Sequence, residues 1–198
     1  MLTCSAWLGV VVAGTLLLTQ YSQSAGLAGA PPPRWPTASL VPYEPGISRL
    51  VLFLHPRCPC SRATLGELER LMADCQGLVR AQVLFFQPEG MPDDWVKTDL
   101  WHAAAAIPGV SVGADPHGEE VRLFLSATSG QAVLYDASGS LLFQGGITLA
   151  RGHAGDNPGR SAIEALLKQS NIHVPGTPVF GCALGVNATQ EVSTTCPP

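Results

Sequence analysis

The feature that most constrains the fold is a run of five apolar residues, Leu50 to Leu54. The run shows no alternation of apolar and polar side chains, which is typical of a central strand covered on both faces. Apolar residues then recur at steps of three and four, which predicts an amphipathic helix over residues 61–74. A buried strand that leads directly into a helix indicates an α/β domain.

The alternation of strands and helices continues along the chain. Apolar runs and capping signals predict strands at 81–86 and 110–112, helices at 93–106, 115–125 and 156–169, and a hairpin of strands 132–135 and 141–143. This order predicts a mixed central sheet with helices on both faces. We expect either Asp156 or Asn157 to cap the last helix.

The N-terminal segment is strongly apolar, and no charged side chain precedes Arg34. Residues 2–21 are long enough, at about 1.5 Å per residue, for a helix to cross a bilayer. We therefore predict a membrane anchor over residues 1–21. A cleaved signal peptide is the alternative, because small residues follow the segment. Both interpretations place the rest of the chain on the extracytoplasmic (periplasmic) side.

Proline and glycine divide the remaining sequence. Residues 22–48 are rich in both and predict a semi-rigid spacer. The folded domain is expected over residues 49–172. Residues 173–198 contain prolines and glycines that break any periodic pattern, so we expect an irregular C-terminal tail.

Composition excludes several classes of protein. An apolar content of 46% excludes a chain that is disordered throughout. The 11 Lys and Arg residues stand against 15 Asp and Glu and form no basic run, so we expect no nucleic-acid partner. The spacing and lysine of a P-loop are absent. We expect no resident cofactor.

Two cysteines in a Cys-Pro-Cys motif, Cys58 and Cys60, lie between the first predicted strand and its helix. Backbone N–H groups at a helix N-terminus favour a thiolate, and Arg57 adds a neighbouring positive charge. A disulfide between the two cysteines would close a small, strained ring that is easily reduced. The motif therefore predicts thiol–disulfide exchange, with both sulfurs accessible to solvent.

The stretch Phe-Leu-His-Pro-Arg-Cys at positions 53–58 resembles the active-site region of the thioredoxin superfamily. The resemblance covers about residues 48–170. Membrane-anchored, extracytoplasmic bacterial thioredoxin-like proteins, the RedB-type group among them, are most similar in arrangement. The resemblance implies a thioredoxin-like fold and a thiol–disulfide oxidoreductase in which Cys58 attacks and Cys60 resolves. Its partners would be cysteine-containing exported proteins or a membrane electron donor.

Three positions depart from the family pattern. Leu52 stands where thioredoxins carry a buried acid, and Ser61 stands where the resolving cysteine is expected. Gly130 takes the place of a cis-proline that faces the active site. In the family this proline is thought to exclude metals from the cysteine pair, so its loss strengthens a metal-binding alternative.

The metal-binding alternative uses Cys58 and Cys60 with His55 and His153. Thiolate and imidazole ligands suit Cu(I) or Zn(II), so the chain would be a copper-binding or copper-delivery module of thioredoxin-like fold. In the redox interpretation His153 would support the cysteines as a proton shuttle. A non-catalytic binding domain is the third possibility.

The other four cysteines fall into two groups. Cys75 completes the apolar stripe of the first predicted helix, and Cys4 lies in the membrane segment. Cys182 and Cys196 lie in the tail, where a disulfide between them would stabilise the fold by roughly 3 kcal/mol. In the alternative interpretation, Cys182 folds back and resolves Cys58.

Overall fold

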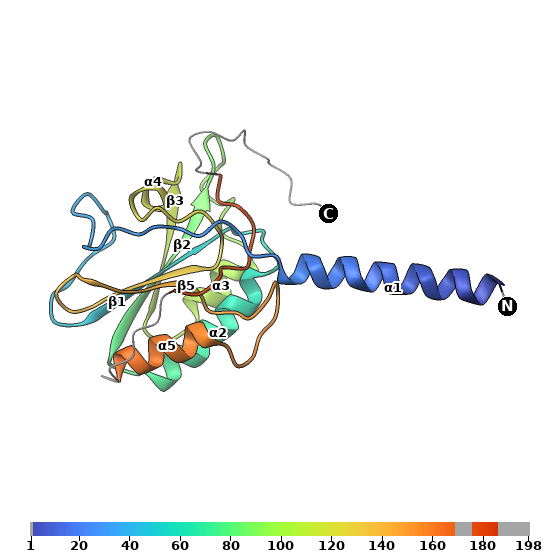
Figure 1. Ribbon diagram of the computed structural model, residues 1–198. Helices are drawn as coiled ribbons and strands as arrows, with labels where there is room; N and C mark the ends of the chain where they lie inside the picture. Colours follow the sequence, from blue (N-terminus) through green and yellow to red (C-terminus); the bar gives the residue numbers. More distant parts are fainter. Residues whose placement is uncertain (1, 169–175, 186–198) are drawn as a thin grey trace.

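The computed structural model of the chain describes residues 2–168 and 176–185, which fold around one mixed five-stranded sheet of order β3-β2-β1-β4-β5 (Figure 1). The strands are β1 (Ser48–Leu54), β2 (Val79–Gln87), β3 (Val110–Pro116), β4 (Gln131–Tyr135) and β5 (Leu141–Gly146). β1 pairs parallel with β2, β2 pairs parallel with β3, and β4 runs antiparallel to both β1 and β5. The predicted order of elements and the predicted mixed central sheet with helices on both faces are confirmed.

Three helices cover one face of the sheet: α2 (Ser61–Asp74), α3 (Asp99–Ala105) and α5 (Pro158–Leu167). α2 and α5 lie side by side below the sheet in Figure 1. The leucines of β1 at 50, 52 and 54 are fully buried beneath these helices, at roughly 1.5–3 kcal/mol for each buried side chain. The apolar run of β1 is uninterrupted because its residues are buried on both faces of the sheet.

The fourth helix of the domain, α4 (Glu119–Leu123), begins four residues later than predicted. Pro116 ends β3 instead of opening the helix. The carboxylate of Asp115 still caps α4, because it accepts hydrogen bonds from the backbone N–H groups of Glu120 and Val121 at 2.8 and 2.9 Å. Because this cap reaches across the turn at residues 117 and 118, the helix begins later than the position of Asp115 predicts.

The opposite face of the sheet is covered by α4 and by extended segments from both ends of the chain. The ring of Trp35 packs against Phe124 and Tyr135, each at 5.2 Å between centroids. The aromatic and apolar side chains of the predicted spacer are thus partly buried on the sheet. Residues 34–43 therefore fold with the domain, and the prediction of a separate spacer does not hold for them.

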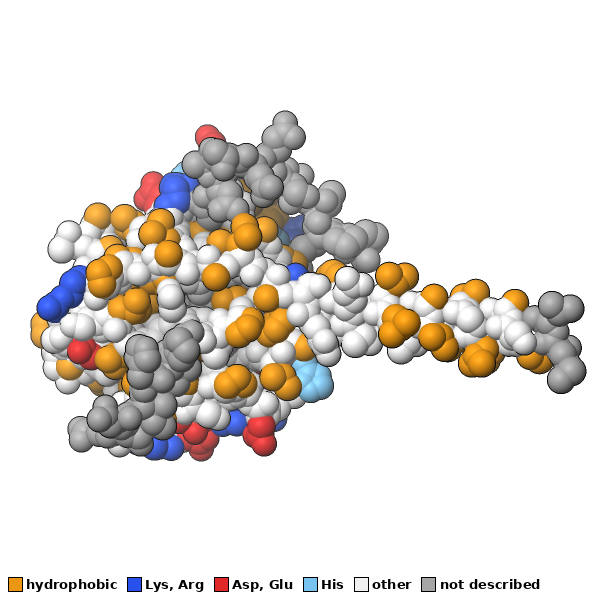
Figure 2. Space-filling view, viewed as in Figure 1, with side chains coloured by type: hydrophobic (Ala, Val, Ile, Leu, Met, Phe, Trp, Pro, Cys, Tyr) orange, Lys and Arg blue, Asp and Glu red, His pale blue; other side chains and the backbone are white. Residues whose placement is uncertain are grey.

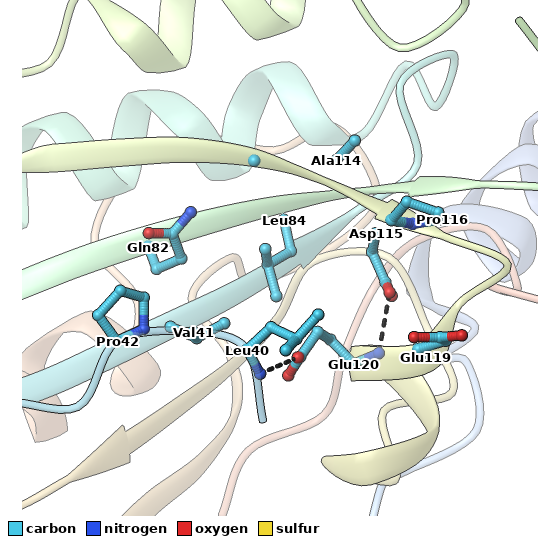
Figure 3. Close-up of a pocket in the computed structure, with 11 residues that line it drawn as sticks. Leu40, Val41, Pro42, Gln82, Leu84, Ala114, Asp115, Pro116, Glu119 and Glu120 are labelled. Atoms are coloured by element: carbon cyan, nitrogen blue, oxygen red, sulfur yellow. Dashed lines mark hydrogen bonds between the residues drawn. The ribbon is translucent and has the colours of Figure 1, made fainter. Parts of the chain in front are cut away.

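The segment 40–42 lines a hollow of about 180 Å³ together with residues of β2, β3 and α4. Figure 3 shows these lining residues as sticks. The backbone N–H of Leu40 donates to the carboxylate of Glu120 at 2.6 Å, which ties the segment to α4. Gln82 and Leu84 form the floor of the hollow. No cysteine lines it, so it is separate from the thiol cluster described below.

Helix α1 (Leu2–Gln23) projects away from the domain as a single rod (Figures 1 and 2). From Cys4 to Gln23 the helix is long and apolar enough to cross a membrane, and none of this span is buried inside the protein. Figure 2 shows apolar side chains along its exposed length. A signal sequence shares these properties, so the helix fits both predictions made for the N-terminal segment.

Candidate functional site

Cys58 and Cys60 lie in the connection between β1 and α2. Two successive turns shape this connection: the N–H of Cys58 donates to the carbonyl of His55 at 3.1 Å, and the N–H of Ser61 donates to the carbonyl of Cys58 at 3.0 Å. Cys60 is the N-cap residue of α2. The structure therefore places both cysteines at the strand–helix junction that the sequence indicates.

The two sulfur-bearing side chains differ in exposure. Cys58 is 0% exposed, whereas Cys60 is partly exposed. The prediction that both sulfurs are accessible is therefore wrong for Cys58. The physical reason is that the C-terminal segment 176–185 returns to this side of the domain, as the next contacts show.

The returning segment pairs with the loop that precedes β4. The N–H of Ser129 donates to the carbonyl of Cys182 at 2.8 Å, and the N–H of Leu184 donates to the carbonyl of Ala127 at 2.9 Å. An antiparallel bridge between residues 128 and 183 lies between these two bonds. The chain thus adds a short extended strand of its own to this loop, and the strand carries Cys182 to the thiol site.

Glycine at position 181 permits this close approach. A Cβ atom at Gly181 would lie 1.9 Å from the carbonyl oxygen of Ser129, which is far inside van der Waals contact. Ser129 is itself fully buried, and its hydroxyl accepts a hydrogen bond from the N–H of His55 at 2.8 Å. Ser129 therefore joins the returning segment to the turn that carries Cys58.

Hydrogen bonds among the cysteines at 58, 60 and 182 shift the pKa values of Cys58 and Cys60 in opposite directions. The pKa of Cys58 is held far below its ordinary value of 9.0, because the thiol of Cys182 and then the thiol of Cys60 donate hydrogen bonds to it. Burial acts in the opposite direction, while backbone N–H groups of the same two residues add to the lowering. The pKa of Cys60 is raised, chiefly because its thiol donates to Cys58 and because it is partly buried. The neighbouring thiols of Cys182 and Cys60 therefore favour the thiolate form of Cys58.

Arg151 is the charged residue of this site that the sequence reasoning missed. Its positive charge partly opposes the rise in the pKa of Cys60, and so does a hydrogen bond from the N–H of Gly152 to the same thiol. Its guanidinium also donates to the carbonyls of Gly181 at 2.7 Å and Ser24 at 3.1 Å. The only available signal was that Arg151 is the one cation among residues 145–157.

A buried carboxylate, that of Glu67, holds the loop that carries Arg151. Glu67 is 0% exposed on α2 and accepts a hydrogen bond from the N–H of Gly155 at 2.7 Å. It also pairs with Arg160 at 2.9 Å and accepts from the side-chain amide of Asn157 at 3.2 Å. Asn157 caps α5, so of the two predicted caps it is the one that the structure shows.

The predicted supporting residues at 57 and 61 have structural contacts. The hydroxyl of Ser61 lies 3.1 Å from that of Ser129 and is buried. The guanidinium of Arg57 lies over the ring of Trp95, 4.9 Å from its centroid, and its charge is not among the main causes of the lowered pKa of Cys58. Neighbouring thiols, instead of a cation, favour the thiolate.

Gly130 has a local reason to replace the proline of the family pattern. Its φ angle is 97°, in the left-handed region that favours glycine, and its N–H donates to the carbonyl of Phe53 at 2.7 Å. Proline has no N–H to donate and fixes φ near −65°. Within residues 2–168 and 176–185 no peptide bond is cis.

Substituting Ala for Gly130 should therefore lower the free energy of unfolding of the reduced protein by about 1–3 kcal/mol. The cause is strain at a positive φ, with the new Cβ also 3.3 Å from the hydroxyl of Thr64. Urea unfolding of the full chain measures this change. The matched variant Gly66→Ala, at an open helical position, should be at least as stable as the unchanged protein.

Cys58 and Cys60 of the metal-binding alternative lie together, but the four residues form no metal site. The Nδ1 atom of His55 accepts a hydrogen bond from the N–H of Arg57 at 3.2 Å, and its ring packs edge-on against Trp95. His153 is exposed. Among the described residues no group of three or more His, Cys, Asp or Glu side chains is arranged to hold a metal ion.

The remaining cysteines are also placed. Cys75 is the C-cap residue of α2 and is 1% exposed in the core, and burial raises its pKa. Cys4 is exposed on α1. Cys196 lies outside the described residues, so its predicted disulfide with Cys182 stays a prediction.

Comparison with known proteins gives similarity at the level of the fold. No protein-family model and no curated protein sequence matches the chain. A hypothetical protein from Sinorhizobium meliloti 1021 is 19% identical with a TM-score of 0.61, over 83% of this chain and 96% of that one. An uncharacterized conserved protein from Geobacillus kaustophilus is 17% identical with a TM-score of 0.61, over 85% and 95% of the two chains. A secreted disulfide oxidoreductase from Mycobacterium tuberculosis is 14% identical with a TM-score of 0.46, over 63% and 82%.

Proposed function

We propose that the protein is a thiol–disulfide oxidoreductase, held on the extracytoplasmic side of a membrane by α1, in which Cys58 is the attacking thiol. The observation that carries this proposal is the set of donors around Cys58: the thiols and backbone N–H groups of Cys182 and Cys60. The thiolate is the reactive form of cysteine in disulfide exchange. The Cys58 thiolate at the strand–helix junction is the nucleophile that this chemistry needs.

The reaction proceeds in two exchanges. The Cys58 thiolate attacks one sulfur of a partner's disulfide, which forms a mixed disulfide and releases the partner's second sulfur as a thiolate that takes up a proton. A second thiol of this protein then attacks the sulfur of Cys58 and releases the reduced partner. The motif assigns this second role to Cys60. A dithiol donor returns the protein to its reduced state, and the reverse sequence oxidises a partner.

The contacts of Arg151 support a site close to the membrane. The positive charge of Arg151 acts to lower the pKa of Cys60. Its guanidinium lies over the ring of Tyr21, near the end of α1, at 5.0 Å from the ring centroid. The backbone N–H of Arg151 also donates to the carbonyl of Ser22 at 2.9 Å. Cysteine-containing exported proteins and a membrane electron donor are the partners that fit this position. Membership of the RedB-type group stays a prediction.

The pH dependence of the thiolate tests the proposed nucleophile. Because the folded-state pKa of Cys58 lies well below 9.0, its thiolate should persist as the pH falls from 9 to about 5, where an ordinary thiol is protonated. The measurement is the ultraviolet thiolate absorbance of the reduced full chain, minus that of the Cys58→Ser variant. A difference signal that appears only as the pH rises toward 9 would contradict the assignment.

A further inference from the structure

The tail strand brings a third thiol to the site, and the two-cysteine motif gives that thiol no role. Cys182 donates to the sulfur of Cys58 through both its thiol and its backbone N–H. Its carbonyl is fixed by the N–H of Ser129. The backbone contacts of Cys182 therefore hold this residue beside Cys58.

We infer that Cys182, carried by the extended strand 179–184, is the thiol that resolves the mixed disulfide on Cys58. This inference rests on the proposed function and changes the identity of its second thiol from Cys60 to Cys182. It also assigns a role to the tail, whose strand covers the nucleophile when the protein is at rest.

The position of Cys60 argues against it as the resolving thiol. Cys60 is the N-cap of α2 with helical backbone angles, φ −67° and ψ −25°, and its carbonyl accepts the hydrogen bond from the N–H of Thr64. A disulfide to Cys58, two residues earlier, would close a small ring across this turn and strain it. A disulfide between Cys58 and Cys182 joins two segments that lie far apart in the sequence, so it closes no such small ring.

In its docked state the tail strand has contacts that hold the thiol of Cys182 in one position. Val179 and Leu184 are buried at 3% and 0% exposure, and the carbonyl of Val179 accepts a hydrogen bond from the N–H of Gly26. The guanidinium of Arg151 holds the carbonyl of Gly181. Because Cys58 is 0% exposed, a partner disulfide reaches it only when a covering segment moves aside.

The partner disulfide gains two electrons as Cys58 and Cys182 are oxidised to one disulfide. Cys58 forms a bond to one partner sulfur while the partner's S–S bond breaks. On return of the strand, the Cys182 sulfur loses its proton to solvent and bonds to the sulfur of Cys58, and the partner's remaining sulfur leaves and takes up a proton.

Oxidised glutathione provides the test. The reduced full chain in detergent is mixed with it, the thiols are blocked by alkylation at set times, and the linked peptides are identified by mass spectrometry. We expect the unchanged protein and Cys60→Ser to form the Cys58–Cys182 disulfide. In Cys182→Ser, glutathione should accumulate on Cys58 at least about tenfold over the unchanged protein, because the resolving thiol is missing.

Two results would overturn the inference alone: accumulation of glutathione on Cys58 in Cys60→Ser but not in Cys182→Ser, or pairing of Cys182 with Cys196 in the oxidised protein. If glutathione links to Cys58 in none of the variants, the proposed function fails as well.

A glycine pair separates the role of the docked strand from the chemistry of the thiols. Gly181→Ala places a Cβ against the carbonyl of Ser129 and changes no cysteine, so it should slow the second step, conversion of glutathione-linked Cys58 to the Cys58–Cys182 disulfide, by about tenfold. The control Gly66→Ala, which has open space around it, should leave the rate unchanged. Equal rates in the two variants would contradict resolution by the docked strand.

Discussion

Replacing Cys58 by serine should reduce the rate at which the reduced protein cleaves a dye-labelled glutathione disulfide by a factor on the order of 10³ or more. The hydroxyl of serine stays protonated at neutral pH and does not attack sulfur. Serine keeps the size and the hydrogen-bonding capacity of the side chain, so the buried position between Cys60 and Cys182 is changed little. The measurement is the initial rate of dye release by the full chain in detergent.

Cys75→Ser is the matched control for this loss. Cys75 is also a buried thiol, but it lies in the core at the C-terminal end of α2 and burial raises its pKa, so it favours the neutral thiol. Its variant should retain the rate of the unchanged protein once any loss of stability is accounted for. Retention of the rate in Cys58→Ser would assign the chemistry to a different thiol.

Replacing Glu67 by alanine should lower the free energy of unfolding by about 3 kcal/mol, near the lower end of the range for breaking a buried ion pair. The carboxylate is fully buried and is shared by Arg160, Asn157 and the N–H of Gly155. Its removal leaves these donors without their central acceptor. Arg160 keeps contacts to Asp156 and Glu164, which moderates the cost.

Thermal unfolding measures this loss as a fall of about 6–12 °C in the midpoint for a chain of this size. Glu69→Ala is the control, because that carboxylate lies two residues away on α2 and is exposed. It should change stability by less than about 0.5 kcal/mol. Equal effects of the two substitutions would show that the buried contacts of Glu67 contribute little.

The local patterns of the sequence predict most of the fold. The apolar run of β1 and the stripe of α2 depend on neighbouring residues, and so does the position of Cys58 and Cys60 between them. Errors arise where a contact crosses a turn, as at Asp115, whose carboxylate caps α4 from the end of β3. The prolines of residues 22–48 predict a stiff spacer, but Trp35 and Val41 in this segment pack against the sheet. This packing depends on strands that are distant in the sequence, so local patterns do not predict it.

Contacts between distant segments account for what the sequence reasoning missed at the site. Glu67 lies outside the apolar stripe of its helix, where an exposed carboxylate is expected, and its burial depends on Arg160 and Asn157, far along the chain. Arg151 stands in a glycine-rich loop without any motif. The return of Cys182 to Cys58 was one of two open alternatives for the tail, because spacing does not determine which cysteines meet.

The identity of the sulfur that captures a partner tests the central claim most directly. The full chain with Cys60→Ser and Cys182→Ser retains Cys58 as the attacking thiol and lacks both candidates for resolution. When it is treated with a disulfide-containing model protein and mapped by mass spectrometry, a mixed disulfide on Cys58 should accumulate, and the added change Cys58→Ser should abolish it. A mixed disulfide on Cys4 or Cys75, or none at all, would contradict the account.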